Sequence, residues 1–451
     1  MDELDRNVLD KQSGVQQLIA IVENSTKIKN RLESLQILRK LSLNLENFGG
    51  NRDTLMNFFE NLLIADTDEV VRTEAALILC KGYKEKALNP MRWALLHEDS
   101  PLCLQAILNG LIEIVNNVVI RNNSATKLIL IHEIIQINDK DFKIGFEMLQ
   151  TTRKVQNFTS KELANILINY FTIVYLKKSY WRLKYTIEKC KIVELDFIFK
   201  GLTQLPNSIK NLTNLKKLTL RYNQITELPD WIDSLIVLES LNLNMNNINK
   251  LPSKIGNLAH LKELLLWKNE LQDLPNSICS LHSLKYLNLR LNQLRSLPMD
   301  LGKLINLIDL NLHDNKLTHI PESIASLKSL ESLNISWNLL TTLPLSIVKL
   351  TSLKSLDLER NELTQIPESI GFLTSLETLN LGDNKLKIVP ETIGKLKKLK
   401  VLNLSRNRLN ELPTSIYNLD NLEELYLNDN TLDIDSTEMK NLIDKGIKIY
   451  L

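Results

Sequence analysis

An asparagine returns every 23 residues through the second half of the chain. It occupies ten positions without a gap: Asn223, Asn246, Asn269, Asn292, Asn315, Asn338, Asn361, Asn384, Asn407 and Asn430. A proline keeps the same step from Pro206 to Pro413. A fixed period of this length is the sequence signature of a solenoid, because each repeat must stack on its neighbours to bury its apolar face.

The repeat unit reads LxxLxLxxNxLxxLPxxIxxLxx. Its xLxLx stretch alternates with period 2, which predicts a short strand with one buried face. In one repeat, Leu218 and Leu220 should point inward, while Thr219 and Arg221 point outward. Stacked repeats should pair these strands as a parallel sheet on the inner, concave arc, with right-handed crossings between them.

The repeated asparagine has a physical reason. After each strand the chain must turn toward the outer arc, which leaves buried backbone groups that no sheet can pair. An Asn amide offers two donors and an acceptor, so we expect each one to satisfy such groups in its own repeat and in the next. The prolines fall on the return side, where a missing N–H does little harm and a fixed φ stiffens the turn.

These residues resemble the leucine-rich repeat family. The stretch LPNSIKNLTNLKKLTLRYN (205–223) is similar to the LPxxIxxLxxLxxLxLxxN form of its intracellular, Ras-group members. The resemblance covers about residues 190–451 and implies an α/β solenoid whose parallel sheet lines the concave face. We expect eleven repeats of 23 residues over 192–434.

Both ends of the repeat array depart from the pattern, as an open solenoid core requires. The first unit carries Lys200 in the asparagine position, which suits an edge repeat. The last part, 435–451, should form a C-terminal cap. There DSTE (435–438) is a capping-box pattern that opens a short helix, Gly446 can end that helix, and IKIYL can close the sheet.

Residues 1–176 lack the 23-residue period and show helical spacing instead. DTDEVVRTEAALIL (66–79) aligns with HEDSPLCLQAILNG (97–110) at an offset of 31. The pattern resembles a HEAT-type helical repeat, in which small alanines let helices approach and Asp68 caps a helix. We therefore expect an all-α, HEAT-like domain over 1–176.

The stretch KKSYWRLKYTIEKCK (177–191) is basic with interleaved aromatic residues. We interpret it as a capping helix or linker whose aromatic rings cover the first repeat. Its alternative interpretation is a nucleic-acid-binding patch.

The composition indicates which partners and which cellular compartment suit the chain. The net charge is +2, so no overall field draws the chain to nucleic acid or anionic membrane. Cys80, Cys103, Cys190 and Cys279 are scattered, which fits reduced thiols in the cytosol. No signal peptide is recognisable. The apolar stretch 163–176 is too short to span a bilayer, so we expect a cytoplasmic protein without a membrane span.

Motifs for catalysis are missing from the sequence. GxxxxGK[ST], GxSxG, HExxH and the protein-kinase motifs are absent, and the six histidines are dispersed. We therefore expect no catalytic residue, no metal site and no cofactor.

The concave face is where a partner should bind. In the expected frame, its outward positions carry Trp, Tyr and Arg, the residue types that dominate binding hot spots. The candidate contact residues are Arg221, Tyr222, Met245, Trp267, Lys268, Tyr286, Arg290, His313, Trp337 and Arg360.

The sequence hypothesis is a non-catalytic scaffold or adaptor that binds a protein on this face. The family resemblance implies small Ras-like GTPases or their effectors as first candidates. Two alternatives stay open: a HEAT-like enzyme or enzyme subunit of the lyase type, and a nucleic-acid binder that uses 177–191.

Overall fold

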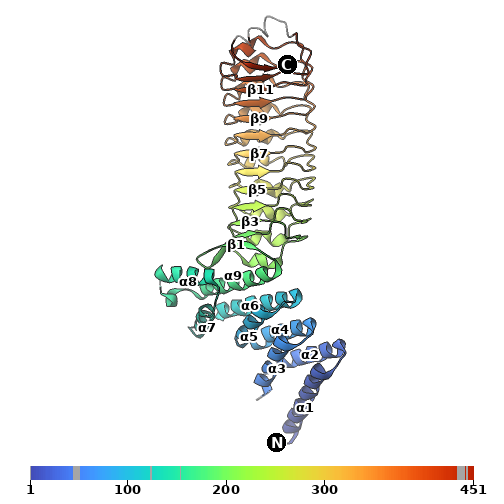
Figure 1. The fold of residues 1–451 in the computed structure, drawn as a ribbon, viewed down its shortest axis with the longest axis vertical. Coiled ribbons are helices and arrows are strands. Elements are labelled where there is room, and N and C mark those ends of the chain that lie inside the picture. Colours follow the sequence, from blue (N-terminus) through green and yellow to red (C-terminus); the bar gives the residue numbers. More distant parts are fainter. Residues whose placement is uncertain (1, 44–50, 122–123, 153, 434–441, 443–444) are drawn as a thin grey trace. The chain divides into compact units, whose positions relative to one another are not determined.

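The computed structural model describes residues 2–43, 51–121, 124–152, 154–433, 442 and 445–451 (Figure 1). The chain forms two compact units, Met1–Ile192 and Val193–Leu451. The expected fold class is confirmed, since helices make up most of the first unit and a parallel repeat sheet makes up the second.

The first unit is a stack of helices in which α4 packs against α2, α3 and α6, and α6 packs against α9. The helices are α1 (Asp2–Asn24), α2 (Ile28–Leu43), α3 (Asn51–Ala65), α4 (Glu69–Tyr83), α5 (Leu88–His97), α6 (Pro101–Arg121), α7 (Ser124–Ile135), α8 (Lys140–Thr152) and α9 (Ser160–Ser179). By length and composition α6 could cross a membrane, but its apolar residues Ile107, Leu111 and Val115 are fully buried among the other helices.

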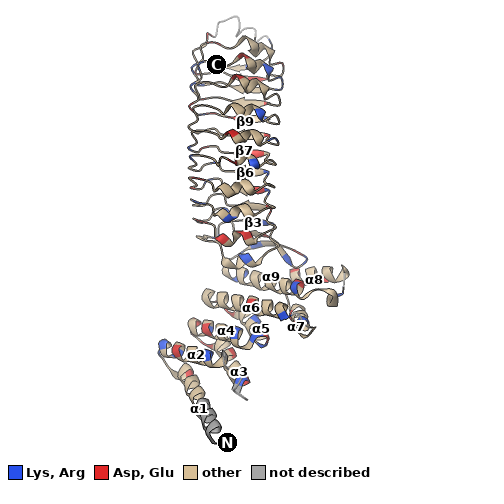
Figure 2. Cartoon of the chain, turned by 180° about the vertical axis from the view of Figure 1, so that it is seen from behind, with Lys and Arg blue, Asp and Glu red and all other residues tan. Residues whose placement is uncertain are grey.

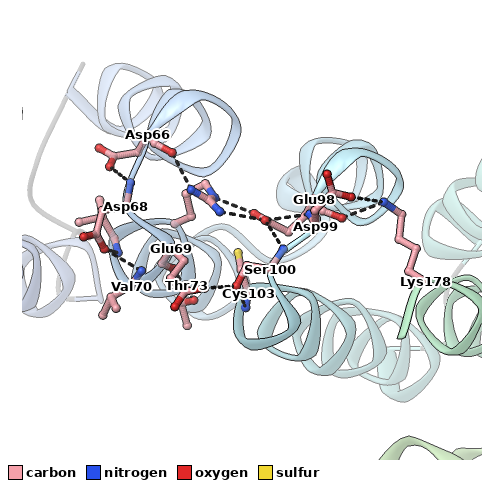
Figure 3. Close-up of polar contacts among 12 residues, drawn as sticks. Asp66, Asp68, Glu69, Val70, Thr73, Glu98, Asp99, Ser100, Cys103 and Lys178 are labelled. Atoms are coloured by element: carbon pink, nitrogen blue, oxygen red, sulfur yellow. Dashed lines mark hydrogen bonds and ion pairs between the residues drawn. The ribbon is translucent and has the colours of Figure 1, made fainter. Parts of the chain in front are cut away.

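Polar side chains tie together the turns that precede α4 and α6 (Figure 3). Asp68 caps α4 by accepting from the backbone N–H of Val70 at 2.8 Å. Arg72 donates from Nε and Nη2 to the two carboxylate oxygens of Glu98, at 2.7 and 2.9 Å. Glu98 also accepts from the backbone N–H of Ser100 at 2.8 Å.

The second helical copy begins one residue later than the alignment predicts. Ser100, rather than Asp99, stands directly before α6, and its Oγ accepts from the backbone N–H of Cys103 at 3.4 Å. Asp99 instead lies 3.6 Å from the ammonium of Lys178. Proline at the first helical position explains the shift, because Pro101 needs no N–H partner there.

The expected capping helix over 177–191 is wrong. Helix α9 ends at Ser179, and Lys184–Glu188 form strand β1. Exposed and half-buried side chains alternate along KYTIE, which is the period of a strand. Lys189 and Cys190 both take left-handed φ, as in a two-residue hairpin turn, and lead into β2 (Lys191–Asp196).

The repeat sheet follows chain order from β2 onward, and neighbouring strands pair in parallel with partners such as Leu218 and Leu241. Its strands are β3 (Lys217–Thr219), β4 (Ser240–Asn242), β5 (Glu263–Leu265), β6 (Tyr286–Asn288), β7 (Asp309–Asn311), β8 (Ser332–Asn334), β9 (Ser355–Asp357), β10 (Thr378–Asn380), β11 (Val401–Asn403), β12 (Glu424–Tyr426) and β13 (Lys448–Tyr450). The central Leu of every strand from β3 to β12 is buried, so the core lies between this sheet and the return side.

Short 3-10 helices form the return side. They are η4 (Asn207–Asn211), η5 (Asp230–Ser234), η6 (Ser253–Asn257), η7 (Asn276–Ser280), η8 (Leu301–Lys303), η9 (Glu322–Ser326), η10 (Leu345–Lys349), η11 (Glu368–Phe372), η12 (Glu391–Lys395) and η13 (Thr414–Asn418). All of these but η8 begin directly after the proline of their repeat. Proline suits this position before the helix, because its missing N–H removes no helical hydrogen bond, while its carbonyl accepts the first one, as Pro206 O does from Ile209 N at 3.0 Å.

The repeated asparagines form a continuous ladder. Asn223 donates from Nδ2 to Leu220 O in its own repeat, at 2.8 Å, and to Phe197 O in the preceding repeat, at 2.9 Å. Its Oδ1 accepts from Leu202 N at 3.0 Å. Each later asparagine through Asn430 makes the same three bonds.

Each asparagine of the ladder makes hydrogen bonds to the preceding repeat, not to the next one as the sequence predicted. This direction explains why Lys200 is tolerated in the first unit, which has no earlier repeat of its kind to hold. At the other end, the expected DSTE capping box lies outside the described residues, while Gly446 has φ +80° and β13 pairs with β12.

We expect Asn315→Ala to lower the free energy of unfolding of the chain by about 2–4 kcal/mol, because it leaves buried backbone groups unpaired. Asn249→Ala is the control, since Asn249 is exposed and makes no side-chain hydrogen bond among the described residues. Urea unfolding followed by circular dichroism measures both variants. Equal losses in the two would contradict a structural role for the ladder.

A pH dependence should follow from Glu98. Burial acts to raise the pKa of Glu98, but hydrogen bonds from Arg72 and Ser100 outweigh it and lower that pKa to about 2. A depressed folded-state pKa stabilises the fold above the ordinary value near 4.5 and loses that effect as pH falls toward 2. Glu98→Gln should therefore cost roughly 2–4 kcal/mol at pH 7 and progressively less below pH 4.5.

Chemical unfolding at several pH values between 7 and 3 measures this difference. Glu147→Gln serves as the control, because Glu147 is exposed on α8 outside the network. A cost for Glu98→Gln that stays constant with pH would show that the carboxylate charge is not what stabilises the turns.

Candidate functional site

The outward side chains of the repeat sheet begin with a structural column. The last residue of most strands is an Asn or Asp whose Oδ1 accepts from the backbone N–H two residues on. Asn288 accepts in this way from Arg290 N at 3.1 Å, and Asn311 from His313 N at 3.0 Å. Such side-chain turns fix the direction of the chain after the strand. They therefore position the second and third residues after the Asn or Asp, which are Arg290 and Leu291 in the repeat of Asn288.

The second of those two residues takes a left-handed backbone conformation in every repeat. Its φ lies between 49° and 59° at Tyr222, Met245, Lys268, Leu291, Asp314, Trp337, Arg360, Asp383, Arg406 and Asp429. This conformation costs an ordinary residue roughly 1–2 kcal/mol, and Asn, Asp or Gly bear it best. Bulky side chains therefore stand here at an energetic cost, which sequence reasoning did not foresee.

These two positions assemble an aromatic–arginine row, made of Phe199, Tyr222, Arg221, Trp267, Arg290, His313, Trp337 and Arg360. It begins with a stacked pair, since the rings of Phe199 and Tyr222 lie 4.3 Å apart and 13° from parallel. The guanidinium of Arg221 lies 4.5 Å from the Tyr222 ring centre and 5.7 Å from that of Trp267.

The row continues through the next repeats. Arg290 lies 6.0 Å from the Trp267 ring centre. The His313 and Trp337 rings are 5.9 Å apart, and the guanidinium of Arg360 stacks on Trp337 at 3.7 Å. Cations over aromatic faces are attracted by the ring quadrupole, so the row holds its arginines against rings rather than against carboxylates.

Partly buried hydrogen bonds support the middle of the row. His313 Nδ1 lies 2.7 Å from Ser336 Oγ, which donates to Asn334 Oδ1 at 2.6 Å. Asn334 in turn donates to Asp357 Oδ2 at 3.1 Å. Burial and the nearby Arg290 lower the pKa of His313, and burial raises the pKa of Asp357.

This histidine–serine pair is not arranged for nucleophilic catalysis. Ser336 is almost fully buried, and its proton is directed to Asn334 rather than to the imidazole. Burial also raises the pKa values of the Cys80, Cys103 and Cys190 thiols to about 12. Within the described ranges, no three His, Cys, Asp or Glu side chains gather to hold a metal ion.

The structure thus brings together seven of the ten candidate contact residues in the row. Tyr286 is 45% exposed on β6, one column earlier, while Lys268 is exposed and Met245 half-buried in the left-handed position. Phe199, 69% exposed, was missed. It lies 23 residues before Tyr222 and directly before Lys200, so applying the outward positions to the first unit as well would have found it.

Comparisons with known proteins agree on the repeat. A leucine-rich repeat region model matches residues 230–314 and 298–384. Leucine-rich repeat models also match 386–432, and 214–235 with 375–396. No curated protein matches the chain.

Many solved structures are similar to part of the chain, including the following three. A leucine-rich repeat protein of Leptospira interrogans is 30% identical over 56% of this chain and 82% of its own, with a TM-score of 0.38. The plant peptide hormone receptor RGFR1, solved in complex with RGF2, is 30% identical, with 51% and 42% covered and a TM-score of 0.45.

The ectodomain of the Arabidopsis thaliana receptor kinase GASSHO1/SCHENGEN3 is 34% identical, with 51% of this chain and 31% of that chain covered and a TM-score of 0.42. This protein therefore spans less than half the length of either plant receptor chain. Through the repeats of residues 214–432, the chain belongs to the leucine-rich repeat family.

Proposed function

We propose that this protein is a non-catalytic scaffold that binds a protein partner on the concave face of its repeat sheet. The aromatic–arginine row carries the proposal. Trp, Tyr and Arg side chains give the largest contributions at protein interfaces, because they bury much area and still donate hydrogen bonds. The row gathers these residue types on one continuous surface.

The backbone of the row supports a binding role. Tyr222, Trp337 and Arg360 all occupy left-handed positions, where Asn or Gly would be less strained. Strain held at defined positions is a pointer to function rather than to stability. The large side chains also remain reachable, since Trp337 is 41% exposed.

The finer assignment is to intracellular signalling. The LPxxIxxLxxLxxLxLxxN form of the repeats resembles the intracellular Ras-group type. We infer a cytoplasmic protein whose partner is a small Ras-like GTPase or one of its effectors. Nucleic acid is outside this proposal, because a net charge of +2 gives no broad basic field.

Affinity capture from the source organism's soluble extract tests the proposal. The baits are the wild type and the triple variant Trp267→Ala, Arg290→Ala, Trp337→Ala. A matched control is Leu345→Ala, Phe372→Ala, Ile388→Ala, which removes three exposed apolar side chains from the return side. Circular dichroism first verifies that both variants are folded.

The expected result is a protein that the wild type and the control retain and the row variant loses. Titration calorimetry with that purified protein should then show at least tenfold weaker binding to the row variant. A Ras-like GTPase or effector among such proteins supports the finer assignment. Identical captures from all three baits would refute the concave-face proposal.

A further inference from the structure

The solenoid pairs many of its charges between neighbouring repeats. Lys262 lies 2.7 Å from Glu239, and the pairs Lys354–Glu331 and Lys400–Glu377 repeat the same geometry at 2.7 Å. Even on the concave side, Arg406 lies 3.4 Å from Asp429. A 23-residue step thus readily places a carboxylate beside a cation.

The arginines of the aromatic–arginine row are exceptions. Within the described part of the chain, Arg221, Arg290 and Arg360 form no ion pair with a carboxylate, although each contacts an aromatic ring. A ring beside a guanidinium does not use the in-plane N–H donors, so the exposed donors of Arg290 and Arg360 can bind a planar, bidentate acceptor. The row therefore holds cations that are oriented but not neutralised.

The first part of the row has more donors than acceptors. Arg221 Nη2 donates to Tyr222 Oη at 3.0 Å, while Arg221 Nε and Trp267 Nε1 find no acceptor among the described residues. These two N–H groups are covered by neighbouring side chains, where an unpaired donor carries a desolvation cost. A partner's acceptors can reach only the donors that are not covered, such as those of the exposed Arg290 guanidinium.

The two ends of the row differ in their charged side chains. The repeats that contain β3 to β6 carry no carboxylate at the second and third positions after the strand. The cations at these positions are Arg221, Lys268 and Arg290. In the three repeats after β7 to β9, the same positions add Asp314 and Glu359. The cationic, aromatic part therefore lies between Tyr222 and Arg290.

We propose that this part of the row receives an extended acidic segment of the partner protein. Two carboxylate side chains of the segment bind Arg221 and Arg290, and an apolar side chain between them packs on Trp267. This inference rests on the proposed function, and it adds the chemistry of the partner.

Strand spacing sets the pattern of that segment. Arg221 and Arg290 are three repeats apart, which corresponds to about 14 Å across parallel strands. An extended chain covers this distance in about four residues, and its side chains at i, i+2 and i+4 face the same way. The expected pattern is therefore an acidic residue at i, an apolar one at i+2 and an acidic one at i+4.

Selection of random peptides displayed on phage against the full chain tests this inference. Enriched peptides should carry two acidic residues four positions apart. The synthetic peptide GSEGLGEGS serves as a defined probe, beside versions with both glutamates replaced by glutamine, by lysine or by phosphoserine. Fluorescence anisotropy measures binding to the wild type and to Arg221→Gln, Arg290→Gln and the matched control Arg406→Gln.

We expect each of the two row variants to weaken binding about tenfold, as for loss of a charge-assisted hydrogen-bonded pair, and Arg406→Gln to leave it unchanged. Affinity for the glutamate peptide should fall with salt. Neutral or basic enriched peptides, a requirement for phosphoserine, or acidic peptides insensitive to both variants would each overturn the inference.

The two proposals fail in distinguishable ways. Peptides that bind the row without acidic residues would overturn the acidic segment and leave the concave-face function standing. If neither the selected peptides nor captured proteins depend on Trp267, Arg290 and Trp337, both proposals fall together.

Discussion

The hydrogen bonds of the repeated asparagines are the constraint on which the repeat unit depends. A solenoid must turn after every short strand, and each turn buries backbone groups that the sheet cannot pair. One amide satisfies a carbonyl of its own repeat and both a carbonyl and an N–H of the preceding one. Because the amide spans two repeats, it fixes both the shape of the turn and the stacking distance. Leucine packing then fills the space that the ladder defines.

The contact surface is a by-product of that same turn. The Asn or Asp that ends most strands accepts a backbone N–H two residues on, and the chain then enters a left-handed conformation before the ladder asparagine. Two consecutive side chains per repeat are thereby projected from a rigid backbone. Since neighbouring repeats present equivalent positions side by side, Arg221, Trp267 and Arg290 meet although they are distant in sequence. Rigid placement of large side chains lowers the entropy lost on binding.

Much of this could be predicted from the sequence, because a strict period converts sequence position directly into spatial position. The sheet, its parallel pairing and most of the row follow from the 23-residue step applied to residues such as Trp337. The direction of the ladder does not, since an Asn amide can equally bond either neighbour until the backbone is known. Residues 177–191 were misjudged because lysine and aromatic residues suit helix and strand alike, and only the alternation of KYTIE separates them. Phe199 was missed because the candidate contact residues were taken only from Arg221 onward, although the frame already placed Lys200, and so Phe199, in the first unit.

Because the ladder bonds point in one direction, they can also form in the order in which the repeats are synthesised. Each asparagine bonds backward, so a repeat leaving the ribosome finds its partner groups already folded. Synthesis at about 5–20 residues per second delivers a new repeat every few seconds, and the amide of each added repeat can bond at once. Loss of repeats from the C-terminal end would leave every remaining amide paired but would unpair backbone groups of the new last turn, as loss of Asn430 would for Leu404 O and Leu409 N. An array that is shortened at this end therefore needs a new cap over its last turn.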